Sequence, residues 1–294
     1  MKILITGING LLGTALSDAL RDKHEIYGID AAAVTSANNY SIDLTEFETT
    51  YQTVTKINPD IVIHTVALTD VDKCETDPDL AYKVNALASR NVAVCCQRFD
   101  AALVYISTDY VFSGDKQNRP KAGYSEYDVV SPQSVYAKTK YEGEKYVREL
   151  LNKFYIIRSS WLYGSKRKNF ITQIAESING NKTVSMADDM VSSPTYAKDL
   201  AAAIAQLIET QMYGLYHITN SGYASRYEVA KELAKIFNVS GANIRKVSLK
   251  ELNLPATRPG FSAMNNYVWR LSGFKPLRPW QDAAKEFLKE NNYL

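Results

Sequence analysis

The fold is decided by one segment near the start of this 294-residue chain, Lys2-Ile-Leu-Ile-Thr-Gly7-Ile-Asn-Gly10-Leu-Leu-Gly13. An apolar run leads directly into three glycines that open a helical pattern. Glycines at such a junction allow a tight turn and let the backbone approach a pyrophosphate, which the helix N-terminus attracts. A glycine turn without a ligand is the alternative, but the position between first strand and first helix favours a dinucleotide site. Its expected members are Gly7, Gly10, Leu11, Leu12 and Gly13.

Short apolar runs alternate with helical patterns along much of the chain. The predicted strands are Lys2–Thr6, Glu25–Ile29, Ile61–Thr65, Leu103–Ser107, Tyr155–Arg158 and Leu215–Thr219. Helical patterns include Leu11–Arg21, Asp79–Asp100 and Ser134–Leu151. Strands that are apolar throughout and separated by helices indicate a parallel sheet covered on both faces. The sequence therefore predicts an α/β fold with a doubly wound, Rossmann-type sheet.

The end of the chain predicts a smaller, partly helical substrate lobe. Ser225-Arg-Tyr-Glu228 has the spacing of a capping box and starts a helical pattern, and Thr45-Glu-Phe-Glu48 has the same spacing. We expect a dinucleotide-binding domain of residues 1–164 together with about 195–222. The substrate-binding lobe is then about 165–194 together with 223–294. It should cover the carboxyl ends of the strands, where ligands of open α/β sheets bind.

The composition excludes several classes of partner. With 34 basic and 32 acidic residues, the net charge of +2 gives no general attraction to nucleic acid or an anionic membrane. The chain has three cysteines and no C-x-x-C spacing, which argues against a disulfide framework and favours a reducing compartment. No signal-peptide pattern or run of about 18 apolar residues is present. We expect a cytoplasmic protein without a histidine-rich metal cluster, and metal dependence stays open.

Asp30 ends the second predicted strand, about 20 residues after the glycines, where a carboxylate can accept hydrogen bonds from an adenosine ribose. A carboxylate there would repel a 2′-phosphate, and the following residues 31–55 contain no lysine or arginine to compensate. The sequence therefore favours NADH over NADPH. The alternative is a carboxylate that merely ends a strand.

Two further motifs suggest the reacting end of the site. Tyr136-Ala-Lys-Thr-Lys140 places a phenol and an amine on one helix face, where the cation should lower the pKa of the phenol and make it a proton donor or acceptor. Ser107-Thr-Asp-Tyr-Val-Phe112 follows an apolar strand, so the Thr108 hydroxyl can bond a substrate carbonyl and orient the tyrosine. A solvated helix face and ordinary turn chemistry are the respective alternatives.

Taken together, these motifs resemble the extended short-chain dehydrogenases/reductases, and most closely the dTDP-4-dehydrorhamnose reductase family. The resemblance covers nearly the whole chain. It rests on Gly7-x-x-Gly10-x-x-Gly13, Asp43-Leu44, Val71-Asp-Lys-Cys-Glu75, Val84-Asn-Ala86, Ser107-Thr-Asp-Tyr-Val-Phe112, Pro132-x-x-x-Tyr136-x-x-x-Lys140, Arg158-x-x-Trp161-x-Tyr-Gly164, Asn169-Phe170, Ser193-Pro-Thr195 and Arg258-Pro259. The runs beginning at Ser107 and Arg158 are the most specific.

The resemblance implies transfer of a hydride from a nicotinamide to C4 of a nucleotide-linked 4-keto-6-deoxyhexose, in the synthesis of deoxysugar and polysaccharide precursors. Tyr136 would give a proton to the developing alkoxide, and Thr108 would hydrogen-bond the reacting oxygen. Lys140 would tune the tyrosine and hold the nicotinamide ribose. The hydride chemistry belongs to the cofactor, and the protein supplies position and electrostatics.

Binding roles follow from the same resemblance. Asp43 and Leu44 would flank the adenine, and Ala67, Leu68 and Thr69 would line the cofactor. Asp109, Trp161 and Arg258 would contact the substrate, with the arginine at a diphosphate. Simple packing of Trp161 and an exposed Arg258 are the alternatives from sequence alone.

The chain departs from the family pattern at two places. Asp189-Met-Val-Ser192 stands where members often carry Asp-Gln-x-Gly, and Ala67-Leu68-Thr69 stands where they often carry Ala-His-Thr. These departures leave the identity of the nucleotide and the sugar open.

Other functions on the same scaffold remain open as well. A nucleotide-sugar epimerase is one, and a 4,6-dehydratase is disfavoured because Tyr110 occupies the position of its expected glutamate. A non-catalytic dinucleotide-binding subunit, resembling the methionine adenosyltransferase regulatory β-subunit, is another, since fold alone cannot exclude it. The expected assembly is a homodimer.

Overall fold

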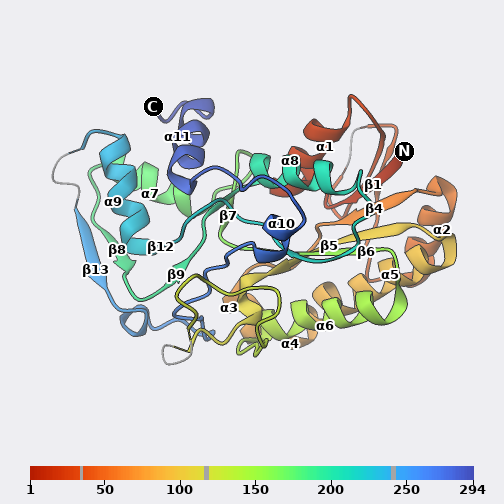
Figure 1. Cartoon of the computed structure of the whole chain (residues 1–294), viewed down its shortest axis with the longest axis horizontal. Helices are drawn as coiled ribbons and strands as arrows, with labels where there is room; N and C mark the ends of the chain where they lie inside the picture. Colours follow the sequence, from red (N-terminus) through yellow and green to blue (C-terminus); the bar gives the residue numbers. More distant parts are fainter. Residues whose placement is uncertain (34–35, 116–118, 240–242) are drawn as a thin grey trace.

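The computed structural model describes residues 1–33, 36–115, 119–239 and 243–294. Within them, seven parallel strands form one sheet in the order β11-β6-β5-β4-β1-β2-β3 (Figure 1). The strands are β1 (Lys2–Thr6), β2 (Glu25–Asp30), β3 (Asn39–Ser41), β4 (Ile61–His64), β5 (Ala102–Thr108), β6 (Phe154–Ser159) and β11 (Gly214–His217). The doubly wound fold is confirmed, and the six predicted strands end within two residues of those found.

The strand order reverses between β1 and β4. From β1 the chain runs outward to β2 and β3, and it then returns to pair β4 with the other side of β1, with Ile3 opposite Ile61. Ligands of open α/β sheets bind outside the carboxyl ends of the strands at such a reversal. The segments that follow β1, β4, β5 and β6 all emerge at this edge, so the topology brings the predicted site residues together.

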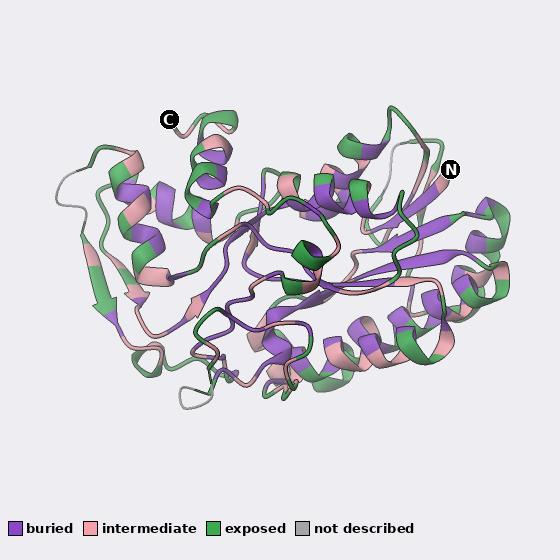
Figure 2. Cartoon of the chain, viewed as in Figure 1, coloured by how far each residue is buried: buried purple, intermediate pink, exposed green. Residues whose placement is uncertain are grey.

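Helices cover both faces of the sheet. α1 (Leu11–Leu20) and α8 (Ala197–Leu207) lie on one face, and α2 (Phe47–Ile57), α5 (Ala88–Phe99) and α6 (Val135–Leu150) lie on the other (Figure 1). Successive strand residues face opposite sides, so Ile3 and Ile5 join the part of the sheet's core beneath α1 and α8, while Leu4 joins the part beneath α2, α5 and α6. Figure 2 shows the result, with buried strands between helices that bury one side and expose the other.

One of the two predicted capping boxes is found. The Ser225 hydroxyl accepts from the Glu228 amide at 3.1 Å and the Glu228 carboxylate accepts from the Ser225 amide at 2.7 Å, at the start of α9 (Arg226–Ile236). The capping box predicted at Thr45 is wrong, because it does not form. There the Asp43 carboxylate accepts the Thr45 amide at 2.9 Å, and this local turn delays the start of α2 to Phe47.

The predicted helix over 79–100 is found as one helical run from Pro78 to Phe99 with a π-helical turn inside it. After the short α3 (Val71–Thr76), α4 (Pro78–Tyr82) continues directly into the π-helical turn, Lys83–Leu87, and then into α5. Such turns are rare and concentrate at functional sites. This one carries Asn85, which is completely buried.

A second core lies at one end of the sheet, among α7 (Phe170–Asn179), α9 and α11 (Trp280–Glu290) (Figure 1). Short strand pairs border it: β7 (Leu162–Tyr163) with β10 (Thr195–Tyr196), β8 (Val184–Ala187) with β13 (Ile244–Val247), and β9 (Val191–Ser192) with β12 (Ala224–Ser225). The remaining short helices are the 3₁₀ turns Asp109–Val111 and Lys250–Leu252 and α10 (Tyr267–Leu271).

The predicted division into two lobes stays a prediction. α10 falls within the 223–294 range, yet its Trp269 packs in the core of the sheet, with Phe274 stacked on it at 4.1 Å between ring centroids. Residues 240–242 of that range lie outside the described residues.

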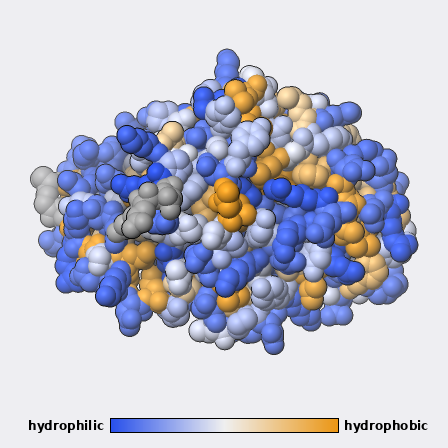
Figure 3. Space-filling model, turned by 60° about the horizontal axis from the view of Figure 1, so that its bottom comes forward, coloured by the Kyte–Doolittle hydropathy of each residue, from blue (hydrophilic) through white to orange (hydrophobic). Residues whose placement is uncertain are grey.

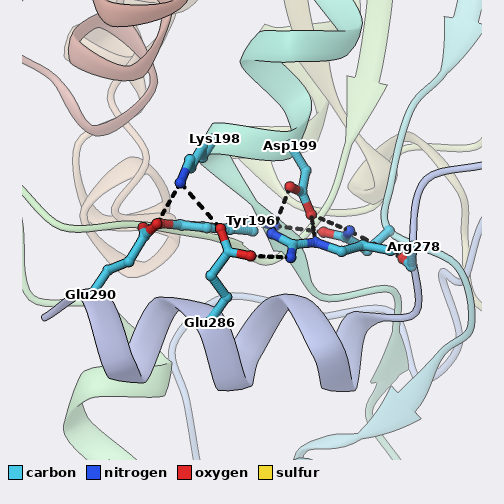
Figure 4. Close-up of polar contacts among 7 residues, drawn as sticks. Tyr196, Lys198, Asp199, Arg278, Glu286 and Glu290 are labelled. Carbon is cyan, nitrogen blue, oxygen red and sulfur yellow. Dashed lines mark hydrogen bonds and ion pairs between the residues drawn. The ribbon is translucent and has the colours of Figure 1, made fainter.

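Ion pairs fasten the C-terminal helix to α8. Arg278 donates to both carboxylate oxygens of Asp199 at 2.8 Å and pairs with Glu286 of α11 (Figure 4). The Tyr196 hydroxyl donates to Glu290 of the same helix at 2.7 Å. Isolated surface pairs stabilise little, but a shared network with a two-bonded arginine fixes the orientation of α11.

The face drawn in Figure 3 is mostly hydrophilic, with small separate hydrophobic patches. Within the described ranges, the helices are all too short or too polar to cross a bilayer.

Candidate active site

The glycine turn after β1 requires glycine for two different reasons. Gly7 has a left-handed φ of +71°, and a Cβ there would lie 2.7 Å from the Thr65 hydroxyl. A Cβ on Gly13 would lie 2.0 Å from the Gly7 carbonyl oxygen, so only glycine lets α1 pack this closely on the turn. No side chain caps α1 at Gly10. Its first amides are therefore placed as the positive end that an anionic ligand would meet.

Leu11 and Leu12 differ in what they can contact. Leu12 is buried in the core of the sheet, whereas Leu11 is only partly buried and packs at its edge. The side chain of Leu12 is thus committed to packing, and Leu11 is the better placed of the two for a ligand.

Asp30 braces the glycine turn from the end of β2. Its Oδ2 accepts from the Asn9 amide at 3.0 Å, and its Oδ1 accepts from the Ala32 amide at 3.1 Å. Each carboxylate oxygen keeps a further lone pair, so both can still accept ribose hydroxyls. Residues 34 and 35, within the segment that lacks lysine and arginine, lie outside the described residues.

Asp43 and Leu44 lie beside each other after β3, with different exposure. Asp43 is exposed, while the Leu44 side chain is buried in the core beneath the sheet. The Leu44 carbonyl accepts from the Asn91 amide group at 3.0 Å. The Leu44 side chain is therefore turned away from any adenine, leaving its backbone as the possible contact.

A buried asparagine holds the segment after β4. Ala67 and Leu68 are half-buried there and Thr69 is exposed. The Asn85 side chain accepts from the Leu68 amide at 2.7 Å and donates to the Leu68 carbonyl at 3.2 Å and to the Thr139 hydroxyl at 3.1 Å. The sequence assigned no role to Asn85, although the Val84-Asn-Ala86 motif contained it. It ties the segment predicted to line the cofactor to the helix turn just before Lys140.

Thr108 and Tyr136 lie near each other. Thr108 is buried at the end of β5, and its hydroxyl is close enough to the Tyr136 phenol to act on the pKa of that group. It also donates to Asp109 Oδ1 at 3.2 Å and accepts from the Tyr110 amide at 3.2 Å. The Tyr110 ring packs edge-on against Tyr136, with 5.8 Å between centroids.

The electrostatic prediction for Tyr136 is wrong in direction. Burial raises the pKa of Tyr136 above its usual value, and the nearby Thr108 hydroxyl opposes this rise. Lys140 is itself buried, with its Nζ 4.3 Å from the centroid of the Tyr105 ring. Burial lowers the pKa of Lys140 to about 7, with Glu144 opposing. The amine thus changes charge near neutral pH, while the phenol keeps its proton.

The helix that carries Tyr136 and Lys140, α6, is fixed to the sheet by a buried ion pair. Arg158 of β6 donates to both carboxylate oxygens of Glu144 of α6, at 2.8 and 2.7 Å. The Ser107 hydroxyl donates to the same carboxylate at 2.6 Å. Three strong bonds therefore hold α6 one turn beyond Lys140.

Asp109 lies inside the protein. Its carboxylate accepts hydrogen bonds from Thr108, from Ser192 at 2.8 Å and from Ser262. Burial raises the pKa of Asp109 to about 6, with the three hydroxyls opposing. Direct substrate contact by Asp109 stays a prediction, and its observed contacts join the end of β5 to β9 and to the Ser262 segment.

Trp161 adopts a backbone conformation that is unusual for its size. Its φ is +42°, in the left-handed region that costs a non-glycine residue energy and that recurs at functional sites. The ring is in edge contact with Phe170, and the Arg226 guanidinium lies 3.7 Å from its centroid. Its indole N–H is buried and has no hydrogen-bond partner among the described residues.

Arg258 is already paired. Its two terminal nitrogens donate to the two carboxylate oxygens of Asp72 at 3.0 and 2.7 Å, and one also donates to the Ala256 carbonyl at 3.0 Å. The arginine holds the pKa of Asp72 below its usual value. A diphosphate at Arg258 would have to compete with this carboxylate.

No group of three or more histidine, cysteine or acidic side chains that could hold a metal ion occurs in the part of the chain that the structure describes.

Known proteins resemble this chain over nearly its whole length. The family model described as the RmlD substrate binding domain matches residues 1–293. A dTDP-4-dehydrorhamnose reductase of Streptomyces griseus is 34% identical, over 96% of this chain and 91% of the relative. The spore coat polysaccharide biosynthesis protein SpsK of Bacillus subtilis is 33% identical, over 99% of this chain and 98% of the relative.

A solved structure agrees in both sequence and fold. The dTDP-4-dehydrorhamnose reductase of Bacillus anthracis, solved in complex with NADP, superposes with a TM-score of 0.91 at 39% identity, covering 98% of this chain and 99% of that one. The family predicted from the motifs is thus confirmed by the family model, by the relatives and by the fold. This chain belongs to the dTDP-4-dehydrorhamnose reductase family.

Proposed function

We propose that this protein uses NAD(P)H to reduce the 4-keto group of a nucleotide-linked 6-deoxy-4-ketohexose, with dTDP as the first nucleotide to test. The contact between Thr108 and Tyr136 at the carboxyl edge of the sheet carries the proposal. It sets a hydroxyl donor and a phenol near each other, and the glycine turn that we expect to hold the dinucleotide follows β1 of the same sheet. The names of the relatives support the same reaction and a place in deoxysugar and polysaccharide synthesis.

In this proposal the protein's own groups move the proton. The bound dinucleotide supplies the hydride. Because burial raises the pKa of Tyr136, the phenol is protonated at neutral pH, the form that can donate to the developing alkoxide. Thr108 holds the reacting oxygen, and Lys140, with a pKa of about 7, is the nearby amine that gains or loses a proton under working conditions.

The cofactor would lie across the reversal of strand order. The turn of Gly7 to Gly13 would hold the pyrophosphate, Asp30 the adenosine ribose, and residues 43–44 and 67–69 the adenine and the nicotinamide half. We propose that NADH is preferred, since the Asp30 carboxylate would repel a 2′-phosphate on the adenosine ribose. The Bacillus anthracis relative was solved with NADP, so the preference of this protein has to be measured with both cofactors.

Isotope transfer separates reduction from epimerisation. With a cofactor carrying deuterium at the transferred position of C4 of the nicotinamide, a reductase leaves one deuterium at C4 of the sugar for each cofactor oxidised. An epimerase would change the sugar without net oxidation and without deuterium in the product. A non-catalytic subunit would bind the dinucleotide and change neither compound. Mass spectrometry of the sugar nucleotide reads out all three cases.

We also propose a cytoplasmic homodimer. The buried cysteines Cys74, Cys95 and Cys96 are free thiols, as a reducing compartment would keep them. Tyr127, Val129 and Leu271 are large apolar side chains with 76%, 88% and 65% of their surface exposed, which a second copy could cover. Light scattering of the wild type and of Val129→Asp tests the assembly, and a monomeric wild type would contradict it.

A further inference from the structure

Arg226 is a partly buried cation for which no ion pair is found among the described residues, although the charge of Asp109 acts on its pKa. It is the first residue of α9, and its guanidinium carbon lies 3.7 Å from the centroid of the Trp161 ring and 3.9 Å from that of Phe170. Among the described residues no carboxylate pairs with it, and its Nη1 is buried without a hydrogen-bond partner. Burial lowers the pKa of Arg226 to about 10, so the group remains charged at neutral pH.

Three other arginines with much of their surface buried differ from Arg226, because each is paired with a carboxylate. Arg158, Arg258 and Arg278 each place two nitrogens on the two oxygens of a carboxylate. Such a pairing offsets the cost of removing a guanidinium from water. At Arg226 two aromatic faces supply part of that compensation, but no anion completes it.

A second donor nearby also lacks an acceptor. Trp161 is only 8% exposed, and its indole N–H is buried without a partner among the residues that the structure describes. Buried donors are almost always paired, so two unpaired donors on touching side chains indicate a site for an acceptor that the chain does not provide.

The position of Arg226 relates it to the reacting groups. Its charge acts on the pKa of Tyr110, whose ring packs against Tyr136 at 5.8 Å. Arg226 packs on Trp161 and Phe170, which belong to the second core together with Tyr136, whereas the glycine turn opens a helix that packs on the sheet. The unpaired cation is therefore grouped with Tyr136 and not with the glycine turn.

We propose that Arg226, held in the corner between the Trp161 and Phe170 rings, binds the diphosphate of the sugar nucleotide. The identity of the ligand rests on the proposed function. A guanidinium fork matches two phosphate oxygens, and contact with two rings inclined at 65° restricts the movement of the side chain. Arg258, which the sequence favoured for this role, would first have to leave Asp72.

The test is calorimetric binding of dTDP, which needs no turnover. Arg226→Met should weaken dTDP binding at least about tenfold, the usual loss for a hydrogen bond to a charged group, and should flatten its salt dependence. Arg226→Lys keeps the charge without the fork and should recover only part of the affinity. Arg245→Met is the matched control, because it removes an exposed arginine from the same end of the chain and should change nothing.

Three results would overturn the proposal. Unchanged dTDP affinity in Arg226→Met is one, and full affinity in Arg226→Lys would contradict the two-bonded contact. Equal loss of NADPH binding, followed by fluorescence, would assign the arginine to the cofactor instead. Because dTDP binding is independent of catalysis, a chain that binds dTDP through Arg226 but reduces no sugar would contradict the proposed function alone.

Discussion

Arg158 and Glu144 form a two-bonded ion pair inside the protein, with side chains only 2% and 0% exposed. The pair joins β6 to α6, the helix that carries Tyr136 and Lys140. A lone charge at either position would be left in a medium that solvates it poorly. The orientation of the catalytic helix therefore depends on both partners being present.

Replacement of Glu144 by glutamine should destabilise the fold strongly. The amide keeps the shape but leaves the Arg158 charge unpaired, so we expect the free energy of unfolding to fall by about 3–5 kcal/mol. Urea unfolding followed by circular dichroism measures this. Glu142→Gln is the control, since Glu142 forms an exposed pair with Lys145 and should change stability by less than about 0.5 kcal/mol. Equal effects of the two changes would refute the importance of the buried pair.

Tyr136→Phe removes the proposed proton donor and little else. We expect turnover to fall at least about 100-fold while dinucleotide binding is retained. Initial rates and fluorescence titration with NADH read out the two quantities. Tyr127→Phe, at a tyrosine that is 76% exposed, should behave as the wild type. Unchanged turnover in Tyr136→Phe would remove this residue from the mechanism.

Asp109 should make stability depend on pH. Burial raises its pKa from 3.8 in the unfolded chain to about 6 in the fold, so the folded state favours the protonated carboxyl. The stability from this group is complete below pH about 3.8 and is lost as pH rises through about 6, a change of up to about 3 kcal/mol.

Asparagine at position 109 cannot titrate, so the comparison isolates the carboxyl. The stability of the wild type relative to Asp109→Asn should decrease between pH 4 and pH 7, measured by urea unfolding. A constant difference across that range would show that the carboxyl keeps an ordinary pKa in the fold.

Gly13→Ala should disrupt the dinucleotide turn. Its Cβ would lie 2.0 Å from the Gly7 carbonyl oxygen, so either α1 or the turn must move. We expect NADH binding to weaken by about tenfold or more, equal to at least about 1.4 kcal/mol. Gly180→Ala is the control at the end of α7, where the nearest atom would lie 3.1 Å away. Full NADH affinity in Gly13→Ala would show that this turn does not hold the dinucleotide.

The sheet could be predicted because its strands are short, apolar throughout and bounded by turn residues. The three-residue strand β3 escaped prediction, since Asn39-Tyr-Ser41 carries no apolar run and forms only by pairing with β2. The residue spacing also gave a wrong prediction at Thr45, because the Asp43 carboxylate accepts the Thr45 amide that a capping box would use. Which of two neighbouring side chains binds an amide depends on the backbone conformation, and residue spacing alone does not specify that conformation.

The proximity of the candidate site residues was easier to predict than their electrostatics. Thr108 ends a strand at the carboxyl edge of a doubly wound sheet, and Tyr136 lies near it, while the roles of both stay predictions. The direction in which the pKa of Tyr136 is shifted could not be predicted, because it depends on the burial of the phenol in the fold. The contacts of Arg258 and Arg226 could not be predicted either, because their partners are distant in sequence. Asp72 is 186 residues from Arg258, and Trp161 also lies far from Arg226 along the chain.

The central claim is tested most directly by the oxidation of NADH and NADPH in the presence of freshly prepared dTDP-4-keto-6-deoxyhexose, with wild type and Tyr136→Phe side by side. We predict loss of the reduced cofactor that requires the sugar nucleotide, is faster with NADH, and falls at least about 100-fold in the variant. Wild-type protein that binds the dinucleotide but oxidises neither cofactor with this substrate would contradict the account.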